Sequence, residues 1–371
     1  MDRLSINQKT IAWLNSAKGI SNKKIEKLVD YFNGSPEYIW DNFETEKFNL
    51  SILKPETISS LINTKNSFEE RLLKRLDSEK ASLITIYDEC YPKRLREIEG
   101  APAILYYKGT LEEIDNLSIS VVGSRKATSY GKWAAEKLTS ELAAFGVNIV
   151  SGLAAGIDSV AHKAALKSGT KTVGIIGCGI DVIYPKFNEK LYAELAEKGG
   201  AVITEYPFGM QPMPNNFHDR NRIISGLSDG VLIIEAQEKS GTLITAGHAA
   251  NQGKEIFAVP GNIDSLYSRG TNSLIRDGAK LTTSVEDIIE EIPELREKSD
   301  LKSKYAYYQK ITGEADENEI KIIDCLRSGS RTAHEIIEEL RMDAGKILSM
   351  LTMLEMKGVI IQITGGRFTL R

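Results

Sequence analysis

The chain has 371 residues, which is enough for two or three domains with sizeable hydrophobic cores. Its 47 Lys and Arg residues against 51 Asp and Glu residues give a formal net charge of −4, so any contact with nucleic acid must come from a local basic patch. Hydrophobic residues make up 42% of the chain and charged residues 26%, which excludes a wholly disordered or fibrous protein.

Residues 1–105 are predicted to form a small N-terminal helical domain and a segment that leads into the next domain. Residues 10–20 and 23–32 have helical periodicity, and Ser21 and Asn22 between them are suited to capping. Residues 91–109 contain two prolines, which favour an extended backbone.

Residues 106–290 are predicted to form an α/β domain with an extended Rossmann-like parallel sheet. Six short apolar runs rich in Val and Ile alternate with helical segments such as residues 130–145 and 157–166. The runs are residues 119–123, 147–152, 172–177, 201–207, 230–236 and 255–261. Runs this continuous are typical of strands covered on both faces. In such sheets the loops after the strands converge on one crevice, where we expect the functional residues.

The last part of the chain is predicted to hold a linker and a third domain. Residues 291–315 are charged with weak periodicity, as in a linker. Residues 316–371 contain three helical patterns and a hairpin that turns at Gly365 and Gly366, which indicates a winged-helix domain. Acidic residues outnumber basic ones there, so we favour a protein-contact or regulatory role over duplex reading.

The first predicted strand of the α/β domain ends in a loop suited to binding phosphate. Gly123 is followed by Ser124, Arg125 and Lys126, which offer a close backbone approach, hydrogen-bond donors and positive charge. The alternative is a tight turn with a solvated basic face. After the second strand, Gly152 could form an anion-binding turn before the next helix.

Three polar residues near these strands could carry chemistry. Asp158 and His162 lie four residues apart on one helix face and could form an acid/base pair, but we interpret them as structural partners. Cys178 has no identifiable general base near it in the sequence, so we interpret it as a small, buried apolar side chain. These residues therefore predict no catalytic centre.

Residues 217–261 are the densest in candidate contacts. Arg220 and Arg222 flank Asn221 at the expected start of a helix, where cations are unfavourable unless an anion binds. Phe217 could stack on a base or belong to the core. Lys254 could contact phosphate or be a solvated turn residue.

The sequence carries no complete nucleotide-cofactor motif. Residues 247–255 depart from a P-loop in spacing and place Glu255 where Ser or Thr should bind magnesium. Glycines 174, 177 and 179 reverse the order of the dinucleotide fingerprint. The three cysteines are far apart, the four histidines are scattered, and no apolar run reaches the length of a membrane span, about 18 residues. We expect a cytoplasmic protein with no cofactor, no metal and no membrane contact.

Six motifs in this order and spacing make the chain resemble the DprA/Smf family of DNA-processing proteins. They are GSRKATSYG (123–131), SGLAAGIDSVAH (151–162), GCGIDVIYPKFN (177–188), FHDRNRIISGLSDGVLIIEA (217–236), SGTLITAGHAANQGKEIFAVPG (240–261) and GTNSLIRDGAKL (270–281). The flanking domains fit the helix-hairpin-helix-like (or SAM-like) and winged-helix domains of many members. The resemblance implies a homodimer that binds single-stranded DNA and loads the RecA recombinase onto it during natural transformation, with single-strand-binding protein as a further candidate partner.

The resemblance also implies roles for particular residues. The phosphate contacts would be Arg125, Lys186, Arg220 and Arg222, and Phe217 would stack on a base. This chain has His218 after Phe217 where the family usually has Pro, so its backbone is less constrained. The residues singled out above in the loops and in residues 217–261 join those that the resemblance implies. Together the predicted DNA-contacting residues are Ser124, Arg125, Lys126, Gly152, Lys186, Phe217, Arg220, Asn221, Arg222 and Lys254.

Two other functions compete with this one. The α/β domain also resembles the nucleotide phosphoribohydrolases related to lysine-decarboxylase-like proteins, which would make the chain a nucleotide-binding protein or a nucleoside monophosphate hydrolase. In those enzymes a Gly-Thr pair precedes paired glutamates, but here Gly241-Thr242-Leu243 is followed by Ile244 and Thr245, which cannot transfer protons at neutral pH. A protein adaptor with incidental DNA contact is the third. We predict a non-enzymatic protein, with a dimer contact near the sheet edge at residues 280–284.

Overall fold

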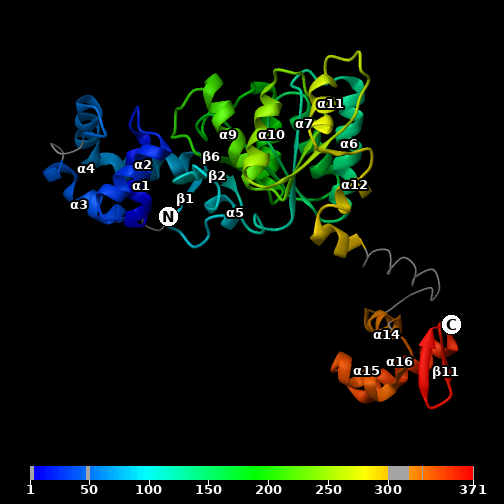
Figure 1. The fold of residues 1–371 in the computed structure, drawn as a ribbon. Coiled ribbons are helices and arrows are strands. Elements are labelled where there is room, and N and C mark those ends of the chain that lie inside the picture. The colour runs from blue at the N-terminus through cyan, green and yellow to red at the C-terminus, as the bar shows by residue number, and fades with distance from the viewer. Residues whose placement is uncertain (1–3, 47–50, 300–316, 328, 371) are drawn as a thin grey trace. The chain divides into compact units, whose positions relative to one another are not determined.

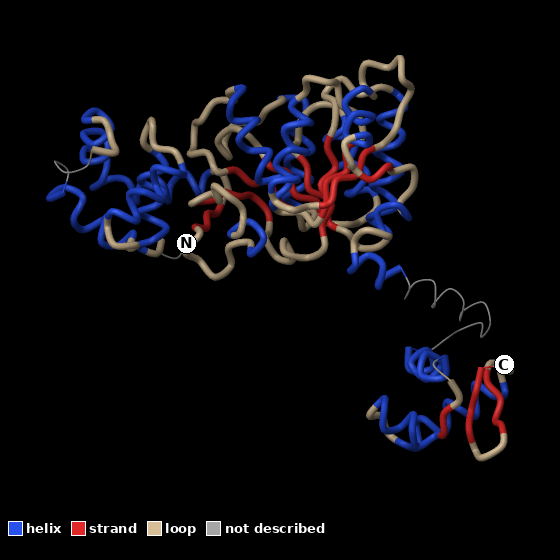
Figure 2. Tube along the Cα trace, in the orientation of Figure 1, coloured by secondary structure: helices blue, strands red, loops and turns tan. Residues whose placement is uncertain are grey.

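The computed structural model describes residues 4–46, 51–299, 317–327 and 329–370. The chain forms two compact units, one ending at Ile292 and the other beginning at Pro293 (Figures 1 and 2). None of the described helices is long and apolar enough to cross a membrane.

The first unit begins with four helices: α1 (Ile6–Ser16), α2 (Asn22–Tyr31), α3 (Pro36–Glu46) and α4 (Pro55–Ser78). Trp13 lies fully buried among them, and its indole N–H donates to the Leu61 carbonyl. The expected capping by Ser21 and Asn22 takes a different form. Ser21 makes no capping hydrogen bond, and the Asn22 amide instead contacts the α/β part of the unit at Glu205.

A nine-stranded sheet follows, with the strand order β1-β2-β6-β5-β4-β3-β7-β8-β9. The strands are β1 (Ser82–Thr85), β2 (Ile104–Gly109), β3 (Ser118–Val122), β4 (Asn148–Ser151), β5 (Thr172–Ile175), β6 (Ala201–Thr204), β7 (Gly230–Ile233), β8 (Glu255–Ala258) and β9 (Lys280–Leu281). Strands β3 to β9 are parallel, and β3 to β7 are buried at every residue. The six predicted strands and the α/β class are confirmed.

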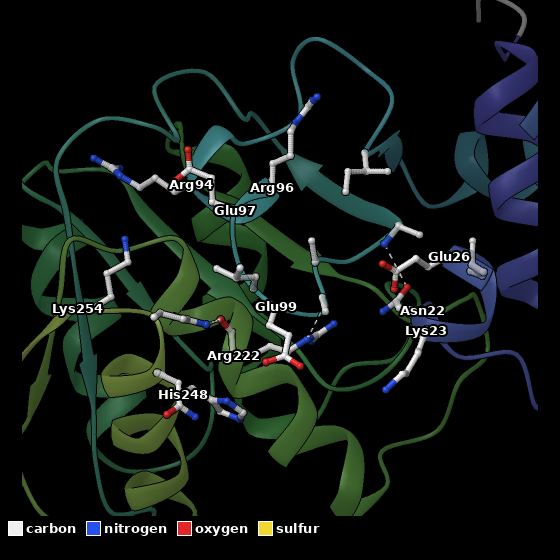
Figure 3. Close-up of a pocket in the computed structure, with 18 of the residues that line it drawn as sticks. Asn22, Lys23, Glu26, Arg94, Arg96, Glu97, Glu99, Arg222, His248 and Lys254 are labelled. Atoms are coloured by element: carbon white, nitrogen blue, oxygen red, sulfur yellow. Dashed lines mark hydrogen bonds between the residues drawn. The ribbon is translucent and has the colours of Figure 1, made fainter. Parts of the chain in front are cut away.

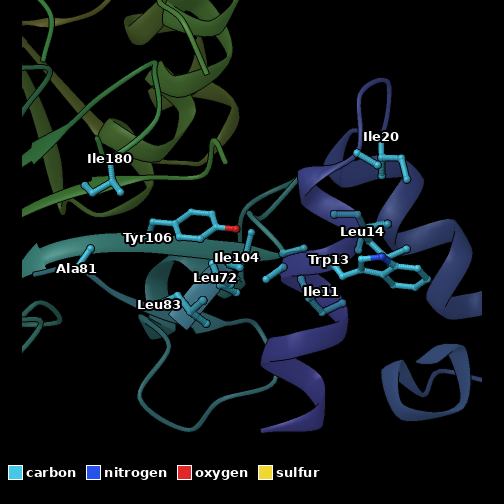
Figure 4. Close-up of a cluster of buried hydrophobic side chains, with 14 of the residues drawn as sticks. Ile11, Trp13, Leu14, Ile20, Leu72, Ala81, Leu83, Ile104, Tyr106 and Ile180 are labelled. Carbon is cyan, nitrogen blue, oxygen red and sulfur yellow. The ribbon is translucent and has the colours of Figure 1, made fainter. Parts of the chain in front are cut away.

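The segment leading into the predicted sheet is itself part of the sheet. Strands β1 and β2 add an antiparallel edge, with Tyr106 of β2 paired with Thr204 of β6. One apolar cluster runs from the N-terminal helices across this edge to Ile176 and Ile180 (Figure 4). The N-terminal helices therefore share a core with the sheet.

The helices of the α/β part are α5 (Lys93–Arg96), α6 (Ser129–Ala144), α7 (Ile157–Lys167), the 3-10 turn η2 (Lys186–Asn188), α8 (Glu189–Glu197), α9 (Pro214–Gly226), α10 (Gly241–Asn251), α11 (Arg269–Arg276) and α12 (Glu286–Ile289). Helix α7 packs on α6 and α8, and α9 packs on α10. The chain crosses from β3 to β6 in one direction and from β7 to β9 in the other, so right-handed connections put α6–α8 and α10–α11 on opposite faces.

The second unit has its own core and a separate three-stranded sheet. Its elements are α14 (Glu317–Arg327), β10 (Arg331–Thr332), α15 (Ala333–Leu340), α16 (Ala344–Met356), β11 (Ile360–Ile363) and β12 (Arg367–Leu370). This arrangement confirms the predicted winged helix. Of the predicted linker, residues 293–299 are helical and 300–315 lie outside the described residues.

Candidate functional site

The sheet changes direction between β3 and β7, and a cavity opens at this point. The two strands are parallel neighbours, but the chain continues from β3 to β4 on one side and from β7 to β8 on the other. Ligand sites of open α/β sheets lie outside the carboxyl ends of strands at such a point. A cavity of about 590 Å³ lies here, between residues 122–126 after β3 and residues 237–242 after β7.

Three side chains stack at this cavity. The Arg125 guanidinium carbon lies 5.1 Å from the centre of the Phe217 ring, and the ring of Tyr184 is 5.5 Å from the same ring at an interplanar angle of 39°. Arg125 and Tyr184 are exposed, whereas Phe217 is half-buried against Gly177. Because the ring holds Arg125 only through its face, the guanidinium N–H groups stay available to an anion.

Among the other predicted residues, Ser124 and Lys126 line the same cavity as this stack, whereas Lys186 is not among the described residues that line it. Ser124 accepts a hydrogen bond from the backbone N–H of Lys126. Lys186 is exposed in η2, directly after Tyr184 and Pro185 and next to the exposed Phe187. Tyr184 is absent from the predicted set. Its position in the loop after β5 was the signal that could have found it.

Arg220 also lines the cavity but is a buried residue, not a surface one. Its guanidinium donates to the carbonyls of Gly152, at 2.8 Å, and of Ile175. The helix-start argument for Arg220 and Arg222 is wrong, because α9 begins at Pro214 and both arginines lie well inside it. Burial lowers the pKa of Arg220, and its charge is compensated by carbonyls and by Asp158.

The expected anion-binding turn at Gly152 is filled by the protein itself. The Asp158 carboxylate lies in the first turn of α7 and accepts from the backbone N–H of Ala154. A Cβ on Gly152 would lie 2.7 Å from both the Asp158 carboxylate and the Arg220 guanidinium, so glycine is required for packing. Burial raises the pKa of Asp158, and Arg220 opposes that rise.

The geometry of α9 divides the predicted residues into two groups. Phe217, Arg220, Asn221 and Ile224 line the cavity at helical spacing, and the Asn221 amide donates to the Gly241 carbonyl at 3.2 Å. Arg222 projects from another side of the helix, where it binds both oxygens of the buried Glu205 carboxylate at 2.6 Å.

Arg222 and Lys254 line a different cavity, of about 920 Å³, together with residues from α2, α5 and α10 (Figure 3). Lys254 immediately precedes β8 and so lies at the amino ends of the parallel strands, the opposite edge from Arg125. Burial lowers the pKa of Lys254. The structure therefore does not bring these two cations together with the Arg125 stack.

Asp158 and His162 are both buried, but they have different partners, which corrects the interpretation that they pair with each other: Asp158 lies by Ala154 and Arg220. His162 is fully buried with Nδ1 2.7 Å from the Thr172 hydroxyl, and burial lowers its pKa to about 3. The buried Cys178 thiol donates to the Val182 carbonyl, and burial raises its pKa to about 11. Within the described part of the chain, no three His, Cys, Asp or Glu side chains gather in a way that could hold a metal.

The comparisons with known proteins agree on one family. The model of the family "DNA recombination-mediator protein A" matches residues 82–293, and that of the "DprA winged helix domain" matches residues 310–366. The chain is 45% identical over 213 residues to DNA processing protein DprA of Streptococcus pneumoniae, covering 57% of this chain and 75% of that one. It is 42% identical over 225 residues to DprA of Bacillus subtilis, covering 60% and 75%.

Two solved structures are also similar. The X-ray structure of S. pneumoniae DprA has a TM-score of 0.65 at 35% identity and covers 78% of this chain and 99% of that one. A structure of DNA processing protein A from Helicobacter pylori, described for its single-stranded DNA binding mode, has a TM-score of 0.53 at 32% identity and covers 58% and 96%. With its two matched domains and the nine-stranded fold, this chain belongs to the DNA recombination-mediator protein A (DprA) family.

Proposed function

We propose that the protein binds single-stranded DNA at the crevice between β3 and β7 and loads the RecA recombinase onto it during DNA uptake. The observation that carries this proposal is the Arg125 guanidinium held over the Phe217 ring, beside Tyr184. A cation and two rings in one exposed stack suit a phosphate and a base, the two features that every nucleotide of a single strand presents. The relative from H. pylori, described for single-stranded DNA binding, supports the same class of ligand.

The charges of the crevice support phosphate binding. Arg125 and Lys126 are exposed, and no described residue forms an ion pair with either of them. Arg220 adds a buried positive charge below the stack, and Asp158 is the one acidic side chain among the described residues that line the cavity. Because Asp158 offsets the charge of Arg220, the net positive charge of the crevice comes from the unpaired Arg125 and Lys126 at its rim, which favour an anionic chain on a protein of net charge −4.

The crevice lacks the groups that hydrolysis of a nucleotide would need, and we propose a binding protein and not an enzyme. Ile244 and Thr245 stand where the related hydrolases carry glutamates, and of these two Thr245 lines the cavity. Glu235, after β7, accepts hydrogen bonds from the backbone N–H and hydroxyl of Thr128 and so holds the N-cap residue of α6. Asp158 is engaged by the turn at Ala154.

Fluorescence anisotropy of labelled oligo-dT tests the binding site. We expect tight binding with a steep salt dependence between about 50 and 200 mM, at a slope near −0.7 per phosphate contact, and weak binding to the matching duplex. Arg125→Glu should abolish binding. The matched control is Arg71→Glu on the exposed face of α4, which should bind like the wild type. Undiminished binding by Arg125→Glu would refute the site.

Recombinase loading and self-association need separate measurements. We expect the protein to stimulate ATP hydrolysis by RecA on single strands covered with single-strand-binding protein, and Arg125→Glu to lose this stimulation. We also propose a homodimer through the sheet edge at β9, where Leu281 is exposed. Sedimentation of Leu281→Asp should give a monomer. A monomeric wild type, or no stimulation of RecA, would contradict these parts of the proposal.

A further inference from the structure

Helix α6 carries an exposed aromatic pair directly after the crevice loop. The helix begins at Ser129, three residues beyond Lys126, and its outer face shows Tyr130 and Trp133, which are 46% and 57% exposed. The two ring centres lie 6.0 Å apart at an interplanar angle of 32°. The Tyr130 hydroxyl donates to the Pro260 carbonyl at 2.9 Å, which fixes the first ring.

Packing of the helix does not require these rings. The inner face of α6 buries Ala134, Ala135, Leu138 and Leu142 against the sheet, whereas Trp133 leaves most of its surface in water. Exposed pairs of large aromatic side chains are typical of surfaces that bind a ligand or a partner.

The position of α6 relative to the crevice is fixed by a buried carboxylate. Glu235 binds Thr128, the N-cap residue whose hydroxyl accepts from Gly131, and its carboxyl group lies so close to Gly131 that a Cβ there would clash. Because Glu235 follows β7 and the Arg125 loop follows β3, one network holds both the loop and the aromatic pair at the carboxyl edge of the sheet.

Lysines surround the aromatic pair. Lys126 and Lys132 are exposed, and neither forms an ion pair with any described residue. Lys137 lies one turn beyond Trp133, with its ammonium 5.5 Å from the ring centre and 4.0 Å from Glu141. Rings interleaved with cations suit the stacked bases and phosphates of a single strand, and Lys126 also lines the crevice.

We propose that the outer face of α6 is a second stacking platform, which takes the part of the DNA single strand that leaves the crevice past Lys126. Trp133 and Tyr130 contact bases, and Lys126, Lys132 and Lys137 contact phosphates. This inference rests on the proposed function, since it extends the same DNA path. A second copy of the chain is the other occupant that such a face could take, and the experiments below separate the two.

Intrinsic fluorescence tests base stacking on Trp133 directly. The chain has three tryptophans. Trp13 is fully buried and Trp40 is half-buried, so Trp133 is the most exposed of them. We expect oligo-dT to quench tryptophan emission in the wild type, and the quenching to disappear in Trp133→Phe while the affinity changes by less than about twofold, since a ring remains. Quenching that persists in Trp133→Phe would overturn the proposal.

The length of the oligonucleotide tests the path. We expect Trp133→Ala to weaken binding of a strand of about 20 nucleotides by roughly 5-fold or more, and to leave a strand of about 6 nucleotides unaffected because the crevice alone holds it. Tyr38→Ala is the matched control, because Tyr38 is also a largely exposed ring, at 46%, but lies on α3. Equal affinity of the wild type and Trp133→Ala for both lengths would refute the platform.

The failure of the platform and that of the proposed function give different results. If Arg125→Glu loses binding to both lengths while Trp133→Ala binds both like the wild type, the crevice stands and the platform is wrong. If sedimentation shows that Trp133→Ala dissociates a dimer while oligo-dT does not quench the wild type, the face is covered by a second copy and the platform is again wrong. If Arg125→Glu binds normally, the proposed function itself fails.

Discussion

Arg220 is a basic residue of the site whose burial gives it a role in stability, in contrast to the exposed Arg125. Its guanidinium satisfies the Gly152 and Ile175 carbonyls and lies close to the buried Asp158 carboxylate. Arg220→Ala leaves these acceptors without donors and a carboxylate without its nearby cation, so we expect the free energy of unfolding to fall by about 3 kcal/mol. Urea unfolding followed by tryptophan emission measures this loss for the first unit, because all three tryptophans lie there.

Arg125→Ala is the matched comparison. Because this guanidinium is exposed and contacts the Phe217 ring, its removal should change stability by less than about 0.5 kcal/mol while it removes DNA binding. If Arg220→Ala instead kept full stability and only reduced the salt slope of DNA binding, Arg220 would be a direct phosphate contact, contrary to its burial.

His162 makes the stability of the first unit depend on pH. Burial lowers the pKa of its imidazole from 6.5 in the unfolded chain to about 3 in the folded one. Below pH 6.5 the unfolded state therefore takes up a proton that the folded state does not, and stability is lost as the pH falls from 6.5 towards 3. Between pH 6.5 and 5 this loss is about 2 kcal/mol.

His162→Gln removes the titrating group. We expect its free energy of unfolding to fall less than that of the wild type between pH 6.5 and 5, as urea unfolding at both values will show. Nε2 of His162 has no hydrogen-bond partner in the described structure, so the substitution sacrifices only the contact with the Thr172 hydroxyl. An identical fall in both proteins would show that other groups carry the pH dependence.

At the scale of single elements, the turn before α7 holds the Arg125 loop in place. Gly156 has a φ of +79°, and a Cβ there would lie 2.2 Å from the Ser124 carbonyl oxygen. Gly156→Ala should destabilise the first unit by more than the roughly 1–3 kcal/mol of backbone strain alone, and it should weaken oligo-dT binding because Ser124 and Arg125 must move. Urea unfolding and anisotropy measure the two effects.

Gly146→Ala separates the two causes. Gly146 also has a positive φ, of +69°, but nothing lies within 4 Å of the space that its Cβ would fill. This variant should show the strain without the clash and keep its DNA affinity. Equal effects of both substitutions would mean that the close approach to Ser124 has no consequence.

How far the sequence predicts the site depends on the element that carries each residue. Arg125 follows β3 and Phe217 lies near the start of α9, after β6, so the two could be placed together because the carboxyl ends of parallel strands meet at one edge of the sheet. The structure brings the Arg125 guanidinium carbon within 5.1 Å of the Phe217 ring centre. Arg222 could not be excluded from the site by its sequence alone. The bounds of α9 are needed to show that its side chain projects from a different side of the helix than Phe217. Lys254 precedes its strand, so the same rule about strand ends places it at the opposite edge. The antiparallel edge of β1 and β2 escaped prediction because its two short strands pair across a long connection.

At the scale of the whole first unit, Glu205 ties the N-terminal helices to the α/β part. Its buried carboxylate binds Arg222 of α9 and the Asn22 amide of α2, and its backbone carbonyl accepts from Asn15 of α1. Glu205→Gln leaves Arg222 without its counter-charge, so we expect a loss of about 3 kcal/mol in urea unfolding. A double-mutant cycle with Arg222→Met should show strong coupling, since both substitutions break one pair. Additive losses would contradict the tie.

We expect the second unit to be dispensable for binding a single strand, because the residues of the proposed site all lie in the first unit. The second unit has an apolar core of its own, formed by described residues between Ile320 and Leu370, and the chain divides into compact units at residue 292, so residues 1–299 should fold alone. The outer side of α16 exposes Leu348, Met353 and Met356, apolar side chains where a DNA-reading helix needs cations. This surface suits a protein partner.

Truncation after residue 299 tests this division. The shortened chain should bind oligo-dT with an affinity within about threefold of the full chain and with the same salt slope, because all the phosphate contacts that we propose lie in the crevice and on α6. Residues 317–370 carry more acidic than basic side chains, and their removal takes away no net positive charge. A salt slope that became shallower by about 0.7 or more on truncation would mean that the winged helix contributes at least one phosphate contact of its own.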